Sequence, residues 1–175
     1  RRLTWKSHID AKLTQTKLKL VQYTWLIGRN SKLSLDCKLL IYYSIFKPIW
    51  VYGIQLWGTA SASNIERIQR CQNKILKMIT GAPWYVRTSH LHRDLNVPLV
   101  KSEIIKYSAN YLQKLESHPN PLARNLLNNR SHQRLRRRET ADLTRWNQME
   151  CSTTRYLFIL KIYINIQILS GTGWT

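Results

Sequence analysis

The sequence predicts a mostly α-helical protein: a helical bundle, then a basic C-terminal segment, then an irregular or short-strand tail. Apolar residues recur every three or four positions through most of residues 1–128, which is the helical period. The hydrophobic fraction of 43%, with seven Trp and nine Tyr, is too high for a charge-driven disordered chain. With 175 residues, the chain is long enough to form one domain with its own core.

The first helix is predicted from Trp5 to Ile27. It carries two apolar stripes at helical spacing, and two stripes predict burial on two sides. The first stripe contains Ile9, Leu13, Thr16, Leu20, Tyr23 and Ile27, and the second contains Leu18, Val21 and Trp25. Gly28 is expected to end the helix in a left-handed cap, a conformation that costs glycine little.

A second helix is predicted to begin after Ser34, whose hydroxyl can cap it. The apolar positions of this helix are Leu35, Leu39, Leu40, Tyr43 and Phe46. Pro48 is expected to kink or end the helix, because proline lacks a backbone donor and clashes with the preceding turn. The apolar and aromatic stretch 48–57 then ends at Gly58.

The third helix has the clearest predicted start, because Ser63 and Glu66 have the spacing of a capping box. Its core face is predicted from the helical spacing of Ile65, Ile68, Ile75 and Ile79, and Gly81-Ala82-Pro83 closes the helix. Beyond it we expect a short helical turn at 91–95, a helix at 99–116, and a short helix at 121–127 that begins with a proline.

The composition changes after these helices and divides the chain into three parts, 1–128, 129–143 and 144–175. The middle part contains the basic run 134–138 (RLRRR), which we expect to be flexible, or helical only when bound. Within 156–169, isoleucines alternate with tyrosine and polar residues, as in a strand. This stretch is too short and too interrupted to span a bilayer. We expect residues 144–175 to be dispensable for the fold.

The charge balance predicts a polyanionic partner. The 28 Lys and Arg residues against 9 Asp and Glu residues give a formal net charge of +19, which is typical of proteins that bind nucleic acid or an anionic membrane. The basic positions are not flanked by an apolar face of the interfacial kind, so we expect nucleic acid and no membrane.

The cysteines and the start of the chain indicate where the protein resides. Three cysteines without a close pair favour a reducing compartment. The chain begins at Arg1 with no apolar leader. We therefore expect a piece of a longer intracellular protein, of the cytoplasm and nucleus, without a secretory signal.

No catalytic or metal-binding residues are predicted in this chain. The nine carboxylates are scattered, and no Asp-Asp or Asp-x-Asp pair occurs that could hold two metal ions. His90 and His92 would not share a helix face, and no Cys or carboxylate lies near them at zinc-site spacing. Polar histidines in a loop or short helix are the favoured interpretation, and no cofactor is expected.

The basic residues fall in register on the predicted helices. Most charge stripes are solvated faces, but a solvated face usually mixes both signs, because like charges at i, i+4 repel. We predict nucleic-acid contacts for Arg67, Arg70, Lys74 and Lys77 on the third helix, Lys12 and Lys19 on the first, and Arg134, Arg136, Arg137 and Arg138 in the basic run. That the stripes are only solvated surface stays open as the alternative.

Aromatic residues can add base stacking to such contacts. Five tryptophans, Trp5, Trp25, Trp50, Trp57 and Trp84, lie within or beside apolar segments, which favours a place in the core. Among the aromatic residues, Trp84 and Tyr85 are the best stacking candidates, because they follow a Gly-Ala-Pro turn and precede Arg87.

A series of motifs resembles, in the same order, the C-terminal region of jockey-type non-LTR retrotransposon reverse transcriptases. The motifs are RRLTWKSHI (1–9), KPIW (47–50), YG (52–53), LWG (56–58), IQR (68–70), QNKILKMI (72–79), APWYV (82–86), HRDLNVP (92–98), HPN (118–120) and RLRR (134–137). Ordered matches over about residues 1–143 are more specific than any single motif. Residues from about 144 onward match nothing in the family.

The resemblance implies the helical thumb of such a polymerase and the segment after it. In that family, this thumb-like bundle holds the template–primer duplex or the element RNA against the palm. The implied partners are RNA, RNA–DNA or DNA duplexes and the palm domain of the parent polymerase. The palm aspartates of the Tyr-x-Asp-Asp box are absent from this sequence. We therefore expect Mg²⁺ to be used only by the full-length polymerase, and this chain to be inactive alone.

A second function remains open: a stand-alone basic helical RNA- or DNA-binding protein, domesticated from such an element. An upstream Tyr-x-Asp-Asp box would favour the polymerase. An open reading frame with its own Met just upstream would favour domestication.

Overall fold

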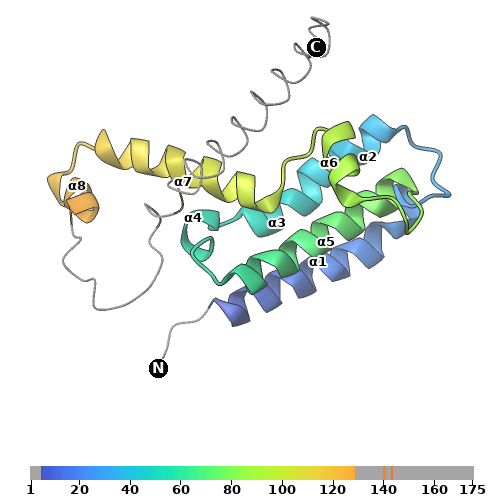
Figure 1. Cartoon of the computed structure of the whole chain (residues 1–175), viewed down its shortest axis with the longest axis horizontal. Helices are drawn as coiled ribbons and strands as arrows, with labels where there is room; N and C mark the ends of the chain where they lie inside the picture. Colours follow the sequence, from blue (N-terminus) through green and yellow to red (C-terminus); the bar gives the residue numbers. More distant parts are fainter. Residues whose placement is uncertain (1–4, 129–139, 141–142, 144–175) are drawn as a thin grey trace, which may run out of the picture.

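The computed structural model of the chain describes residues 5–128, 140 and 143, and all regular secondary structure in this part is helical (Figure 1). The helices, in chain order, are α1 (Lys6–Ile27), α2 (Leu35–Ile41), the π-helical turn η1 (Tyr42–Phe46), α3 (Lys47–Val51), α4 (Ile54–Trp57), α5 (Ala62–Thr80), α6 (Thr88–Asp94), α7 (Val100–Glu116) and α8 (Pro121–Asn128). The predicted mostly α-helical fold class is confirmed for these residues.

Helices α1 and α5 lie side by side and run in the same direction (Figure 1). An ion pair joins Asp10 to Arg67 near their starts, and the Arg29 side chain lies beside Gly81 just beyond their ends. The α2–η1–α3 path packs against this pair, and α7 packs against α4 and α5. Two apolar clusters fill the interior, one with Trp50, Trp57 and Ile104, the other with Tyr42, Phe46 and Leu76.

Only one of the two apolar stripes of α1 is buried. The first stripe contributes Ile9, Thr16, Leu20 and Ile27 to the interior, as predicted. The prediction for the second stripe is wrong, because Leu18, Val21 and Trp25 are 68%, 76% and 74% exposed. No helix in the described part of the chain covers that side of α1.

Helix α1 ends at Gly28, but the predicted left-handed cap is wrong. Gly28 has φ −67° and ψ 172°, which is extended backbone. A Cβ at this position would lie 2.6 Å from the Thr24 carbonyl oxygen, so a close backbone approach explains the glycine. The buried Lys38 ammonium donates to the Gly28 carbonyl (3.0 Å), which places a positive charge at the negative end of the α1 dipole.

Ser34 caps α2 as predicted, because its Oγ accepts a hydrogen bond from the Cys37 amide (3.3 Å). Pro48 does not end the helical path. The turn before it widens into η1, where the Lys47 amide donates to the Tyr42 carbonyl five residues earlier. A widened turn of this kind accommodates the proline ring without breaking the helix.

The predicted capping box at the start of α5 is wrong. The helix begins at Ala62, and no side chain caps its first turn. Ser63 instead exchanges a hydrogen bond with the Ser61 hydroxyl (3.1 Å), and Glu66 pairs with Arg70. At the other end, Gly81 closes the helix in the left-handed conformation, with φ 62°, as the sequence predicts.

The later helices agree with the prediction. Helix α6 includes most of the predicted turn at 91–95, and α7 and α8 match the helices predicted at 99–116 and 121–127. Pro121 is the first residue of α8, and the Asn120 side chain accepts a hydrogen bond from the Leu122 amide (2.9 Å). These local signals were therefore sufficient to place the helix starts.

The tryptophans divide between the interior and the surface. Trp50 and Trp57 are buried, as predicted, and the half-buried Trp5 donates from Nε1 to Thr59 Oγ1 (3.2 Å). A place in the core is wrong for Trp25 and for Trp84, which are exposed.

Beyond α8, two residues of the 129–143 part are described. Leu143 is fully buried beside Trp57 in the first apolar cluster, and Thr140 Oγ1 donates to the Gln55 carbonyl (3.3 Å). The basic run 134–138, the predicted strand within 156–169 and the expected dispensability of 144–175 lie outside the described residues.

Candidate nucleic-acid interface

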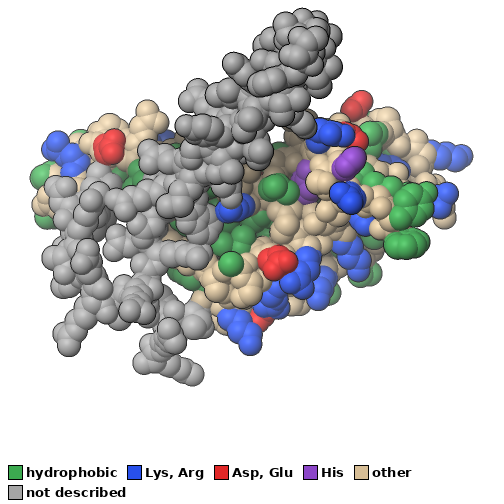
Figure 2. Space-filling view, in the orientation of Figure 1, with side chains coloured by type: hydrophobic (Ala, Val, Ile, Leu, Met, Phe, Trp, Pro, Cys, Tyr) green, Lys and Arg blue, Asp and Glu red, His purple; other side chains and the backbone are tan. Residues whose placement is uncertain are grey.

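The four basic residues predicted on the third helix lie together on the outer side of α5. The opposite side of the helix is buried, through Ile65, Ile68, Ile75 and Ile79 among others. The spacing of Arg67, Arg70, Lys74 and Lys77 therefore places them away from the core, as the periodicity indicates. In Figure 2, Lys and Arg side chains gather over the α1–α5 side of the molecule, with acidic side chains among them.

The N-terminal half of this row is electrically paired. Arg67 Nη2 forms a short ion pair with Asp10 of α1. Arg70 Nη2 lies 3.4 Å from Glu66 Oε2, one turn earlier on the same helix. Each guanidinium thus has a carboxylate beside it, so this half presents little net charge to a polyanion.

The C-terminal half of the row is not paired. Lys74 is exposed and has no ion pair with any residue that the structure describes. Lys17 of α1 and Lys74 both lie close enough to the half-buried Cys71 thiol for their positive charges to act on it. Burial raises the pKa of Cys71, and the two positive charges oppose that rise.

Lys77 completes this half, and Arg29 and Arg87 lie in the loops that follow α1 and α5. Lys77 Nζ donates to the Trp84 carbonyl (3.1 Å), Arg29 lies beside Gly81, and Arg87 is exposed at the start of α6. The sequence contains no Asp or Glu from 67 to 93 or from 11 to 35, the segments that supply these residues. We call the set Lys17, Arg29, Lys74, Lys77 and Arg87 the cationic end of the α1–α5 pair.

Lys12 and Lys19 do not join this surface. Lys12 Nζ lies 5.0 Å from the ring centre of Tyr52, in the turn after α3. Lys19 Nζ lies 5.7 Å from the ring centre of Tyr23, which itself packs edge-on against Phe46 of η1. Both ammonium groups therefore face the α2–η1–α3 side of α1.

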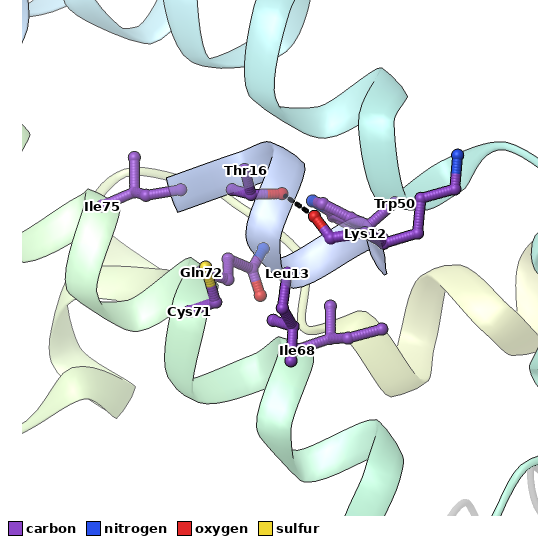
Figure 3. Close-up of a pocket in the computed structure, with 8 residues that line it drawn as sticks. All are labelled: Lys12, Leu13, Thr16, Trp50, Ile68, Cys71, Gln72 and Ile75. Carbon is purple, nitrogen blue, oxygen red and sulfur yellow. Dashed lines mark hydrogen bonds between the residues drawn. The ribbon is translucent and has the colours of Figure 1, made fainter. Parts of the chain in front are cut away.

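The cavity beside Lys12 is too small for a ligand. A cavity between α1, α3 and α5 is bordered by Lys12, Thr16 and Trp50, and the Thr16 hydroxyl donates to the Lys12 carbonyl (Figure 3). The cavity is about the size of one water molecule. Contacts with a large partner must therefore be made on the outer surface.

The two histidines have different environments. His90 is exposed, whereas His92 is buried and donates from Nδ1 to the Val97 carbonyl (2.8 Å), with Nε2 beside Asn73 Oδ1 (2.8 Å). In the part of the chain that the structure describes, no three His, Cys, Asp or Glu residues are grouped to hold a metal ion.

Trp84 and Tyr85 project from the loop between α5 and α6, and both are exposed. They adjoin the cationic end through the bond from Lys77. The basic residues predicted in the run 134–138 lie outside the described residues; they are Arg134, Arg136, Arg137 and Arg138. Among those residues, no helix is both long and apolar enough to cross a bilayer.

Sequence reasoning missed Lys17, Arg29 and Arg87 as members of this surface. Lys17 and Arg29 come from one segment and Arg87 from another, and the parallel packing of α1 on α5 brings Lys17 and Arg29 to the α5 side. The sequence does contain a feature that could have indicated these residues, because the two segments that contain them, 11–35 and 67–93, have no carboxylate.

Comparison with known proteins shows what the chain is related to. It is 46% identical over 143 residues to the probable RNA-directed DNA polymerase from transposon X-element of Drosophila melanogaster, an alignment that covers 82% of this chain and 16% of that protein. It is 41% identical over 138 residues to the probable RNA-directed DNA polymerase from transposon BS, covering 79% of this chain and 15% of the relative.

A third relative gives the same result. The RNA-directed DNA polymerase from mobile element jockey of Drosophila melanogaster is 41% identical over 126 residues, which are 72% of this chain and 14% of the relative. The chain thus spans about one sixth of the length of these relatives. No family model matches, and no solved structure matches.

Proposed function

Because the chain is related, over most of its length, to a segment of jockey-type non-LTR retrotransposon RNA-directed DNA polymerases, we propose that it is the part of such a polymerase that holds nucleic acid. In this proposal the helices form the thumb and the segment after it, and they bind the backbone of an RNA–DNA or DNA duplex, or the element RNA. The palm of the parent polymerase is the proposed protein partner, and it would hold the Mg²⁺ ions.

The cationic end is the observation that supports this role. Five cations from α1, α5 and the loops that follow these two helices lie on or beside one surface, and none of them is paired with a carboxylate in the described part of the chain. Lys and Arg contacts of this type bind phosphates and position a duplex without reading its sequence.

Two double variants with the same change in charge test this proposal. We expect Lys17→Gln with Lys74→Gln to make the dependence of log affinity on log salt shallower by about 1 to 2 units, since each lost phosphate contact removes about 0.9. We expect Arg67→Gln with Arg70→Gln to change the slope by less than about 0.5, because Asp10 and Glu66 already neutralise these guanidinium groups. The measurement is a salt titration of binding to a blunt RNA–DNA duplex.

Because both variants lose the same charge, a difference between their salt slopes reports where on the surface the charge acts. Gln preserves helix propensity, so both variants should keep the helical circular dichroism of the unaltered chain. If the salt slope becomes shallower by the same amount in both variants, the binding reflects overall charge only. If the salt slope is unchanged in both variants, the cationic end is a solvated surface that does not contact the duplex.

We also expect that the chain alone will not extend a primer. The carboxylates of the described part are singly placed, and they do not assemble with His or Cys into a group that could hold a metal ion. The measurement is primer extension with template, dNTPs and Mg²⁺ or Mn²⁺. Template-dependent incorporation by the purified chain would contradict this expectation.

A further inference from the structure

The loop between α5 and α6 presents two aromatic rings to solvent. Trp84 is 87% exposed and Tyr85 is 69% exposed. Their ring centres are 6.0 Å apart and their planes meet at 81°, an edge-to-face arrangement. In this arrangement each ring keeps at least one face clear of the other ring, so a flat molecule can stack on one ring and touch the other.

The loop is held in place by its own backbone and by Lys77. Gly81 adopts the left-handed conformation, and the amides of Gly81 and Ala82 donate to the Met78 and Lys77 carbonyls, which closes α5 in a Schellman motif. The Lys77 ammonium bonds to the Trp84 carbonyl (3.1 Å). The rings are therefore presented without the ordering cost that a mobile loop would have on binding.

The surroundings of the two rings select the kind of partner. Lys77 and Arg87 lie beside the pair, and the chain contains no carboxylate from 67 to 93. A partner must therefore combine flat, polarisable groups with negative charges close by. Nucleobases joined by phosphates have this combination, and base stacking on aromatic rings tolerates any sequence.

We propose that Trp84 and Tyr85 form a stacking site for an unpaired nucleobase, with an adjoining phosphate on Arg87. The site is distinct from duplex backbone binding, because bases inside a duplex do not offer a free face. Lys77 is a positioning residue, which fixes the loop through the Trp84 carbonyl. This proposal rests on the proposed function for its ligand class, but not on the duplex contacts of Lys17.

The test compares three probes: a blunt RNA–DNA duplex, the same duplex with three unpaired nucleotides at one end, and that overhang with abasic nucleotides. For the full chain, we expect Trp84→Leu to weaken binding of the base-carrying overhang about fivefold or more, the size of one stacked base. Binding of the blunt and abasic probes should not change. Trp84→Phe should retain most of the affinity, because it keeps an aromatic face.

Tyr85→Leu and Tyr52→Leu form a matched pair, because both tyrosines are largely exposed and only Tyr85 adjoins Trp84. We expect Tyr85→Leu to lower the affinity for the base-carrying overhang probe and Tyr52→Leu to leave that affinity unchanged. The stacking site is overturned if Trp84→Leu binds the overhang as tightly as the unaltered chain, or if it loses equally on all three probes. Failure of duplex binding is scored separately, since a base-dependent loss on the overhang would support the stacking site even if the blunt duplex did not bind.

Discussion

We expect the replacement of Glu103 by glutamine to lower the free energy of unfolding by about 2 to 3 kcal/mol. Glu103 lies in the first turn of α7, where a carboxylate also interacts with the positive end of the helix dipole. Its Oε1 accepts from Lys47 Nζ at 2.9 Å, and the side chains are 4% and 19% exposed. Glutamine keeps the shape but leaves the Lys47 ammonium without its counter-charge in a site that is mostly removed from water.

The exposed pair of Arg70 and Glu66 supplies the control. Its side chains are 69% and 63% exposed, and exposed pairs contribute about 0 to 1 kcal/mol. Urea unfolding followed by circular dichroism should therefore show a clear fall in stability for Glu103→Gln and almost none for Glu66→Gln. Equal effects would mean that the link between Lys47 and Glu103 has no special weight in holding α7 against the η1–α3 path.

Periodicity within one helix was enough to predict most of the helical bundle. The buried face of α5 follows from the isoleucine spacing, and the end of α5 follows from Gly81, because only glycine adopts the left-handed conformation at low cost. The start of α8 follows in the same way from Asn120 and Pro121. In each case the cause lies within four or five residues of the effect.

Two of the errors, at Pro48 and at the second stripe of α1, have the opposite character, since their causes are distant in the sequence. Pro48 continues the helical path only because the turn at 42–46 widens, and that turn is stabilised by the burial of Tyr42 and Phe46 against other helices. The second stripe of α1 looks like a core face by periodicity, yet Trp25 is exposed because no described helix packs there. An apolar stripe shows that a helix face can be buried, but it does not show that another element packs against that face.

The candidate interface shows the same division. The row on α5 could be predicted from one helix, but its division into a paired half and an unpaired half could not. Asp10 neutralises Arg67 across 57 positions of sequence, and the parallel packing of α1 on α5 brings Lys17 within reach of the same thiol, Cys71, as Lys74. The charge of a surface depends on which helices are neighbours, and the tertiary structure determines this, not the sequence of any one helix.

We expect the replacement of Gln72 by leucine to lower the free energy of unfolding by about 3 kcal/mol. Gln72 is buried in α5, and its Nε2 donates to the Tyr42 hydroxyl (2.9 Å) and to the Pro98 carbonyl (2.9 Å). Leucine fits the apolar surroundings but leaves two buried polar groups with no partner, each of which costs about 1 to 3 kcal/mol. The effect is measured as a lower urea midpoint at an unchanged m-value.

Adding Tyr42→Phe to Gln72→Leu separates the lost hydrogen bonds from a simple change of shape. Burial raises the pKa of the Tyr42 phenol, so its hydroxyl stays protonated and needs an acceptor or donor nearby. The second change removes that unsatisfied hydroxyl, and removal of both partners of a buried bond costs much less than removal of one. We therefore expect the double variant to be more stable than the sum of the two single losses by about 1 kcal/mol, a coupling typical of residues in contact. Strictly additive losses would show that the hydrogen bond between Gln72 and the Tyr42 hydroxyl does not stabilise the junction of α5 with η1.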